Sequence, residues 1–405
     1  MQTIEQLLLT RAFGPALAAQ YQTGHLPERL LAPVARSLAT LSLSFTDRAK
    51  FARGYLKDAD LRRAYLLYYL PSNLPKIRFL LNELSIHPGG LPLGQELRLL
   101  DLGAGQGAAT LGLLDYLNTA RGLTYSQLRI VGVDLTSQSL EDYRWLVSQY
   151  LETIYPISHC LETYPVQLES GLPATVDGEY DLIIAANFLN ELFRNNTAAI
   201  ALRARWLAEE IGPRLASDGS IIIIEPALKD TTQALMQLHD LLINQYGFTI
   251  YSPCPTANNC PMLSVSVRDW CHSSVDWQRP SIITQLDKLI GNRKESLKFS
   301  YLILRRDGRS LIDTIASSSK TSCWRLVSDP HSEKGKTLIY ACGGGAYLPM
   351  VRLKRAQSPA NAQFAKVERG QLATLGEAMQ RAQEVRIEQE TLVELYGPYF
   401  ETPPA

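Results

Sequence analysis

Three of the six cysteines of this chain lie close together, in the stretch 251–272, which reads "YSPCPTANNCPMLSVSVRDWCH". Cys254, Cys260 and Cys271 follow the spacing C-x5-C-x10-C, and prolines flank the first two. Proline stiffens a loop and so reduces the entropy lost when its side chains are held around a ligand. Since thiolates are strong ligands for zinc and iron, this pattern predicts a metal site in the loop.

A metal site of this kind needs a fourth ligand, and three residues are candidates for it. Cys342 ends the apolar stretch "LIYAC" just before a glycine run, Cys323 lies in "TSCWRL", and His272 directly follows Cys271. Neighbouring residues seldom ligate one ion together, which disfavours His272. Cys160 is expected in the core. The spacing is not that of paired zinc knuckles, yet the residues alone leave both zinc and an iron–sulfur cluster open.

A glycine-rich turn is the second feature that could do chemistry. In "LLDLGAGQGAATLG", Asp101 precedes Gly103, Gly105 and Gly107, and Asp134 ends the next predicted strand. Glycines there let a ligand approach the backbone, and a carboxylate can accept hydrogen bonds from ribose hydroxyls. A dinucleotide site places that acid about 20 residues further on, whereas Asp134 lies 27 residues beyond Gly107. The pattern favours S-adenosylmethionine over a nicotinamide or flavin cofactor or a purely structural turn.

Polar residues interrupt the apolar stretch "YDLIIAANFLNELF" at the end of a later predicted strand. Asn187 is a candidate cofactor or substrate contact, with a helix N-cap as the alternative. Methyl transfer often needs a base, and only Glu191 and Glu225 are available as weak candidates. The catalytic residues therefore stay unassigned.

Strands and helices that would position these residues alternate from residue 97 onward. Apolar strands separated by helices predict a parallel α/β sheet of the Rossmann-like, class I S-adenosylmethionine methyltransferase type. We predict an N-terminal helical region (1–90), the cofactor-binding domain (91–250), a cysteine-rich and β-rich metal-binding extension with the last sheet strands (251–355), and a helical tail (356–405). Residues 85–95 form a turn-rich linker.

Charge and hydropathy restrict the possible partners of the chain. Residues 279–355 hold 15 Lys or Arg against 6 Asp or Glu, a net charge of +9 in a chain of net charge zero. Such a segment is either a solvated face or a surface for nucleic acid. No run of 18 apolar residues predicts a membrane helix, and the first residues lack the basic start of a signal peptide. We therefore expect a cytoplasmic protein, without a membrane partner, whose cysteines are thiols or metal ligands.

Several stretches together resemble one family. "AYLLYYLPSNLPKIRFLLNEL", "LLDLGAGQGAATLG", "YDLIIAANFLNELF", "YSPCPTANNCPM" with "DWCH", "FSYLILRR" and "KTLIYAC" are similar to the methyltransferase-like proteins of the small ribosomal subunit, a group that includes a mitochondrial ribosome assembly factor. The resemblance runs from about residue 40 to 355. The Pro-Cys-Pro, Cys-Pro and Asp-Trp-Cys-His succession is its most specific part.

This resemblance implies both cofactors and a partner. It implies a [4Fe–4S] cluster held by Cys254, Cys260, Cys271 and Cys342, with zinc as the alternative. It also implies S-adenosylmethionine on the glycine turn and Asp134, and association with the small ribosomal subunit and its rRNA through the basic segment 279–355. An assembly factor is the first hypothesis, an active methyltransferase with a structural metal is the second, and a metal or redox sensor is the third.

Overall fold

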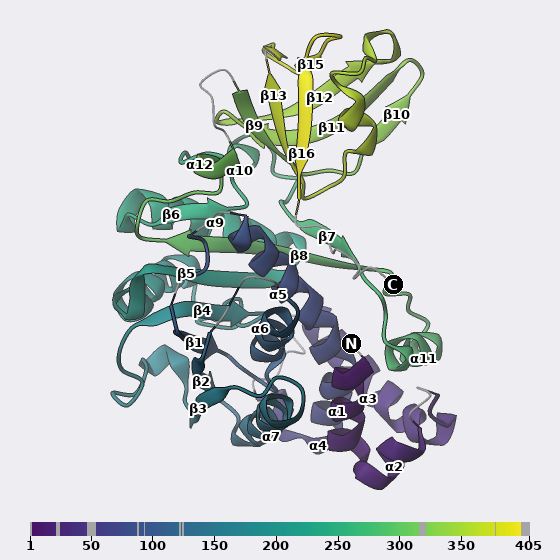
Figure 1. Ribbon diagram of the computed structural model, residues 1–405, viewed down its shortest axis with the longest axis vertical. Helices are drawn as coiled ribbons and strands as arrows, with labels where there is room; N and C mark the ends of the chain where they lie inside the picture. Colours follow the sequence, from purple (N-terminus) through teal and green to yellow (C-terminus); the bar gives the residue numbers. More distant parts are fainter. Residues whose placement is uncertain are drawn as a thin grey trace. The chain divides into compact units, whose positions relative to one another are not determined.

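The computed structural model describes residues 2–21, 25–46, 54–86, 89–92, 94–120, 123, 125–315, 321–376 and 378–397. The chain divides into two compact units, whose helices and strands are labelled in Figure 1. The first comprises residues 1–81, 93–186 and 275–297, and the second comprises residues 82–92, 187–274 and 298–405. Among the described residues, no helix combines the length and the apolar character that crossing a membrane requires. Part of the expected linker, at 87, 88 and 93, lies outside the described residues.

The first unit begins with helices, as expected for residues 1–90, and continues with alternating strands and helices. Its helical elements are α1 (Gln2–Phe13), α2 (Pro15–Gln20), α3 (Glu28–Thr46), η2 (Tyr55–Lys57), α4 (Ala59–Ala64), η3 (Tyr65–Tyr69), α5 (Leu70–Ser85, which continues into the second unit), α6 (Ala108–Thr119), α7 (Ser137–Thr153), η4 (Leu168–Ser170) and α11 (Ser281–Ile290). Its strands are β1 (Glu96–Leu102), β2 (Gln127–Asp134), β3 (Ser158–Pro165) and β4 (Tyr180–Ala186).

These four strands form a parallel sheet in the order β3-β2-β1-β4. β1 and β4 are almost wholly buried, which matches their near-continuous apolar sequences. β3 is largely exposed, so its sequence "SHCLETYP" lacks the apolar run that marks a central strand. Cys160 lies on this strand and is exposed, so the expectation that it is a core residue is wrong.

The second unit contains the remaining elements. They are α8 (Ala199–Trp206), η5 (Leu207–Ile211), η6 (Gly212–Arg214), β5 (Leu215–Pro226), α9 (Lys229–Tyr246), β6 (Thr249–Ser252), α10 (Pro261–Val265), β7 (Ser273–Asp276), β8 (Ser296–Arg305), α12 (Ile312–Ile315), β9 (Thr321–Leu326), β10 (His331–Glu333), β11 (Lys336–Gly343), β12 (Ala346–Leu353), η7 (Lys354–Ala356), η8 (Ala362–Lys366), β13 (Leu372–Gly376), β14 (Met379–Gln380), β15 (Val385–Ile387) and β16 (Leu392–Tyr396). The last residues of β7 and the first residues of β8 belong to the first unit.

Two groups of strands build the second unit. In one group, β8 lies between β5 and β6 and is antiparallel to both. The other group, β9 to β16, closes around its own core, which includes Trp324, Ile339, Met350 and Phe364, each at most 1% exposed. Strands β8, β9, β11 and β12 lie in the segment 251–355, for which the sequence predicts a β-rich extension with the last sheet strands.

The predicted helical tail at 356–405 is wrong over its described part. Two short 3-10 turns are followed by four strands, β13 to β16. The segment is rich in Glu, Gln and Ala, which favour helices. However, Val385, Ile387 and Val393 are buried in the core of the β9–β16 group, and the burial of alternate residues along a strand outweighs helix propensity.

Candidate functional site

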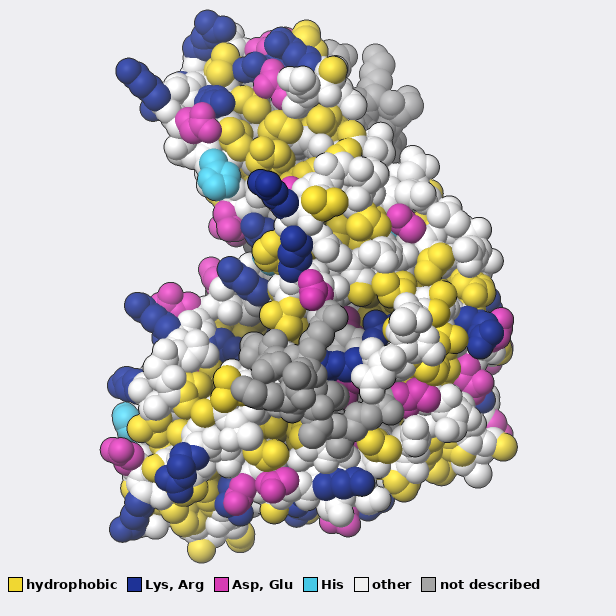
Figure 2. Space-filling model, turned by 180° about the vertical axis from the view of Figure 1, so that it is seen from behind, with side chains coloured by type: hydrophobic (Ala, Val, Ile, Leu, Met, Phe, Trp, Pro, Cys, Tyr) yellow, Lys and Arg dark blue, Asp and Glu magenta, His cyan; other side chains and the backbone are white. Residues whose placement is uncertain are grey.

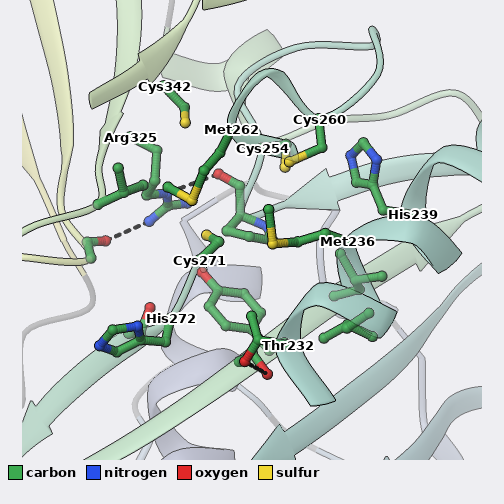
Figure 3. Close-up of a pocket in the computed structure, with 18 of the residues that line it drawn as sticks. Thr232, Met236, His239, Cys254, Cys260, Met262, Cys271, His272, Arg325 and Cys342 are labelled. Carbon is green, nitrogen blue, oxygen red and sulfur yellow. Dashed lines mark hydrogen bonds between the residues drawn. The ribbon is translucent and has the colours of Figure 1, made fainter. Parts of the chain in front are cut away.

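The four cysteines predicted as metal ligands line one cavity of the second unit (Figure 3). Cys254 follows β6, Cys260 precedes α10, Cys271 precedes β7, and Cys342 lies on β11. Cys260 and Cys342 are 6% and 8% exposed and belong to one buried cluster, against which Cys271 packs. The thioethers of Met236 and Met262 lie among them. Cysteines up to 88 positions apart in the chain therefore meet around one space.

The structure also distinguishes the three candidates for the fourth ligand. Cys342 lines the cavity with the three loop cysteines, and so does His272. Cys323 does not line it, since it lies on β9 in register with Thr374 of β13. His272 Nδ1 lies 3.2 Å from the Trp270 carbonyl oxygen, so that nitrogen is engaged with the backbone.

Burial raises the pKa of all four thiols. Burial raises the pKa of Cys271 to about 12 and that of Cys254 and Cys342 well above the ordinary value, and the neighbouring cysteines raise these pKa values further. Four thiolates in such a cavity would repel one another without a cation. Within the described ranges, no group of three or more His, Cys, Asp or Glu side chains is gathered closely enough to hold a metal ion.

A histidine that the sequence analysis missed lines the same cavity. His239 of α9 is 1% exposed, and its Nδ1 lies 2.8 Å from Asp240 Oδ1. The same carboxylate oxygen accepts the backbone N–H of Cys260 at 2.8 Å. Among the described residues, His239 Nε2 has no hydrogen-bond partner. A buried polar atom without a partner is costly, so this nitrogen is a free acceptor or donor on a residue that lines the cavity.

The side chains around the cavity are of the types that bind soft metals, although the described side chains are not drawn together around one point. Four thiols from two segments, two thioethers and an unpartnered imidazole nitrogen line the space. Soft sulfur ligands select zinc, copper(I) or iron–sulfur clusters. Cys254, Cys260, Cys271 and Cys342 would hold such a group, whose positive charge would stabilise the thiolates.

The glycine-rich turn lies in the first unit, between β1 and α6. Gly103, Gly105 and Gly107 have φ values of 65°, 51° and 93°, the left-handed region that glycine adopts at little cost. Asp134 Oδ2 accepts the Gly105 N–H at 2.9 Å, and Asp134 Oδ1 accepts the Thr136 N–H at 2.8 Å. The end of β2 thus fixes the turn that follows β1, which suits a nucleotide-type cofactor.

Asp101 is buried beneath this turn and is 1% exposed. Its Oδ2 accepts the Thr110 hydroxyl of α6 at 2.7 Å, and that hydroxyl lies 2.7 Å from the Tyr143 phenol oxygen of α7. Burial raises the pKa of Asp101 to about 7, against the lowering effect of the Thr110 hydrogen bonds. Asp101 therefore joins β1 to α6, and its predicted contact with a cofactor stays a prediction.

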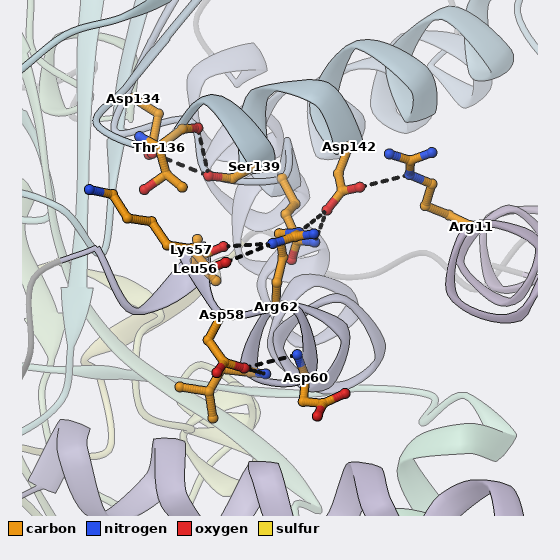
Figure 4. A network of polar contacts seen from close by, with 12 residues as sticks. Arg11, Leu56, Lys57, Asp58, Asp60, Arg62, Asp134, Thr136, Ser139 and Asp142 are labelled. Atoms are coloured by element: carbon orange, nitrogen blue, oxygen red, sulfur yellow. Dashed lines mark hydrogen bonds and ion pairs between the residues drawn. The ribbon is translucent and has the colours of Figure 1, made fainter.

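A third carboxylate, which the sequence analysis missed, connects the N-terminal helices to the turn (Figure 4). Asp142 of α7 accepts hydrogen bonds from Arg11 Nε at 2.7 Å, Arg62 Nε at 3.1 Å and Gln106 Nε2 at 2.7 Å. Arg62 also donates to the carbonyl oxygen of Leu56 at 3.1 Å. Leu56 lies 3.9 Å from where a Gly105 Cβ would be, so the segment around η2 borders the glycine turn.

Replacing Gly107 with alanine is expected to destabilise the first unit by about 2 to 3 kcal/mol, because the left-handed φ and an overpacked contact both add cost. A Cβ at Gly107 would lie 2.9 Å from the Tyr143 ring. Gly247→Ala is the matched control, since φ there is also positive (67°) but a Cβ would meet nothing within 4 Å. Urea unfolding measures both variants, and equal losses would show that the Tyr143 contact costs nothing.

Asn187, the predicted contact after β4, has φ 56°, which is unusual for a residue other than glycine. Its N–H donates to the Ile224 carbonyl oxygen at 2.7 Å. Nearby, Asn190 donates to both oxygens of Glu225. Burial raises the pKa of Glu225 to about 7, although the Asn190 hydrogen bonds lower it. Glu225 is 2% exposed and accepts hydrogen bonds from Asn190, and these bonds fix the loop that follows β4.

Taken together, the parallel β3-β2-β1-β4 order, the glycine turn after β1 and the acid at the end of β2 define a class I methyltransferase-like protein with a mixed α/β architecture. A family model described as mitochondrial small ribosomal subunit Rsm22 matches residues 62–353. The chain belongs to this family, which confirms the resemblance noted in its sequence.

Solved structures similar to this chain include three methyltransferases. The small RNA methyltransferase HEN1 is 12% identical, with a TM-score of 0.36, over 58% of this chain and 26% of that one. The plantazolicin methyltransferase BpumL in complex with SAH is 14% identical, with a TM-score of 0.32, over 69% and 98%. The Synechocystis PCC 6803 magnesium protoporphyrin IX methyltransferase with bound SAH is 11% identical, with a TM-score of 0.35, over 64% and 100%. A comparison with curated proteins finds no match.

Proposed function

We propose that this protein is a cytoplasmic assembly factor that associates with the small ribosomal subunit and binds S-adenosylmethionine and a [4Fe–4S] cluster. The observation that carries the proposal is the meeting of Cys254, Cys260, Cys271 and Cys342 around one cavity, in a chain that belongs to a small-subunit family. S-adenosylmethionine would lie against the turn at Gly103 to Gly107, with Asp134 near its ribose.

The cluster has a structural role in this proposal. Three ligands lie on the 253–272 segment, and the fourth lies on β11 of the β9–β16 group. A group bound by all four would join these parts of the second unit. Metal binding would then stabilise the folded state directly, since the unfolded chain has no such site. Loss of iron would weaken the part of the protein that contains β11.

Several basic side chains of the segment 279–355 are buried or already paired, so fewer of them can contact rRNA than its net charge suggests. Arg305 and Arg325 are 0% and 3% exposed and are paired with Asp307 and Glu83. Lys294 packs its ammonium 4.4 Å from the centroid of the Tyr68 ring. The charges that face solvent include Lys298, Lys334, Lys354 and Arg355, and we propose that contacts with rRNA use these.

Two measurements on anaerobically purified protein test this function. We expect about four iron and four sulfide per chain, with absorption near 400 nm, and small-subunit rRNA that co-purifies from cell extract in a salt-sensitive manner. Colourless protein with one zinc per chain would show that the site holds zinc and not an iron–sulfur cluster. Failure to recover small-subunit rRNA and proteins would contradict the assembly role.

The second candidate is an active methyltransferase, favoured by the Asp134–Gly105 arrangement and the left-handed Asn187 at the end of β4. It predicts transfer of a labelled methyl group from S-adenosylmethionine to ribosomal particles or another acceptor. Asp134→Ala should abolish that transfer. Glu191→Gln tests whether Glu191 acts as the general base of the reaction. Binding of S-adenosylmethionine without any transfer would contradict this candidate and leave the assembly role intact.

A further inference from the structure

The strands β9 to β16 of the second unit follow the connectivity of an OB-fold. β9, β11 and β12 are consecutive antiparallel neighbours, and β12 pairs in parallel with β15. β13 pairs antiparallel with β9 and with β16. The helical turns η7 and η8 lie between β12 and β13. If β15 and β16 are counted as two halves of one strand, this is a five-stranded Greek-key arrangement with a helical element after the third strand.

The outward face of β11 and β12 corresponds to the second and third strands, the face through which OB-folds bind oligonucleotides. Ile339 and Met350 are 0% exposed and point into the core of the group. Because side chains alternate along a strand, the residues between them point outward. This opposite face carries Lys336 with Leu353, Leu338 with Val351, Tyr340 with Pro349, and Cys342 with Tyr347. Val351 and Cys342 are 4% and 8% exposed, and Cys342 lines the cysteine cavity, so the part of the face that solvent reaches centres on Lys336, Leu338 and Tyr340.

Two tyrosines give this face a platform for stacking. The rings of Tyr340 and Tyr347 have centroids 5.5 Å apart and are inclined by 34°. Tyr340 is 37% exposed, and Tyr347 is partly exposed. The Tyr347 hydroxyl donates to Asp269 Oδ2 at 3.3 Å, which orients its ring. Nucleic-acid bases stack on such rings without a strict sequence preference.

Positive charge lies at the other end of the same face. Lys334, Lys354 and Arg355 are exposed, and among the described residues none of them forms an ion pair. The Lys354 N–H donates to the Gly335 carbonyl oxygen at 2.9 Å, which places the β10–β11 turn beside the end of β12. Glu333 is already paired with Lys336 at 3.0 Å. Figure 2 shows Lys and Arg side chains around exposed hydrophobic ones over the C-terminal strands.

We propose that the outward face of β11 and β12 binds single-stranded RNA, with Tyr340 and Tyr347 stacking on bases and Lys334, Lys354 and Arg355 contacting phosphates. Lys336 and Tyr340 are four residues apart, so the charged end and the tyrosines are separated by about 13 Å along the strand. A single strand can extend over both. A duplex cannot, because its bases are already stacked on one another. The choice of RNA over DNA rests on the proposed ribosomal function.

The test uses full-length, anaerobically prepared protein and a fluorescein-labelled oligouridine of twelve nucleotides, with binding measured by anisotropy. Tyr340→Ala should weaken binding about tenfold, within the range measured for the loss of one base stack. Tyr340→Phe should retain the affinity, because the ring remains. Tyr396→Ala on β16 is the control and should bind as the wild type does. Lys334→Ala combined with Lys354→Ala should reduce the slope of log K against log salt by about 1.4.

Unchanged binding by Tyr340→Ala, or equal competition by a duplex of the same length, would overturn this inference. Iron and sulfide contents of each variant must match the wild type, because Cys342 lies on the same face opposite Tyr347. Wild-type protein that holds its cluster and does not bind the oligouridine would overturn this inference alone. Protein that binds it through Tyr340 yet recovers no small-subunit rRNA would overturn the proposed function alone.

Discussion

Replacing Cys342 with serine is expected to reduce the iron and sulfide of the anaerobically purified protein to less than about a tenth of the wild-type content. Cys342 is 8% exposed and is the cavity-lining cysteine that lies outside the 253–272 segment. A serine hydroxyl is a far weaker ligand for soft metals than a thiolate. The thermal midpoint should fall as well, because a metal that binds only the folded state contributes its binding free energy to folding.

Cys323→Ser is the matched control for this prediction. Cys323 is also buried, at 7% exposed, and lies on β9 of the same strand group, yet it does not line the cavity. Its replacement should cost some stability but leave the metal and sulfide content unchanged. A Cys342→Ser protein with full iron and sulfide would show that another residue, such as His239 or His272 in the same cavity, completes the site.

Replacing Arg325 with methionine is expected to reduce the free energy of unfolding by about 3 to 5 kcal/mol, the usual cost of leaving a buried charge without its partner. Arg325 lies 2.5 Å from Glu83 Oε1, and the two residues are 3% and 0% exposed. Glu83 Oε2 also accepts the hydroxyls of Tyr301 at 2.6 Å and Ser252 at 3.0 Å. Urea unfolding monitored by circular dichroism measures the loss.

Arg325 also supports the cysteine segment. Its Nε donates to the Pro253 carbonyl oxygen at 2.8 Å, next to Cys254, and one terminal nitrogen donates to the Gly370 carbonyl oxygen at 2.6 Å. The Arg325→Met variant should therefore lose metal faster to a chelator than the wild type does. Leu or Met at both positions 83 and 325 should recover part of the stability, because no buried charge then lacks a partner.

An exposed ion pair provides the comparison. Arg293 and Glu295 are 78% and 59% exposed and lie 2.7 Å apart, so Arg293→Met should change the stability by less than about 1 kcal/mol. If Arg325→Met lowered the free energy of unfolding as little as Arg293→Met does, the Glu83–Arg325 pair would not stabilise the second unit.

The sequence by itself determined the features that depend on local preferences. Glycine at 103, 105 and 107 predicts a left-handed backbone, because that conformation is sterically unfavourable for residues with a Cβ, and all three glycines adopt it. Long apolar runs predict buried strands, and β1, β4 and β8 are such strands. The exposed edge strand β3 and the strands β13 to β16 were missed, because short half-buried strands leave only a weak alternation in the sequence.

Only the tertiary structure decided which distant residues meet. It places Cys342 rather than Cys323 at the cavity, and it adds His239, whose neighbours in the sequence give no sign of a site. It buries Arg305 and Arg325 within a segment whose composition predicts a charged surface. The types and spacing of neighbouring residues indicate the local backbone conformation. Which residues form a ligand set or a buried ion pair depends instead on how strands that are far apart in the chain pair and pack.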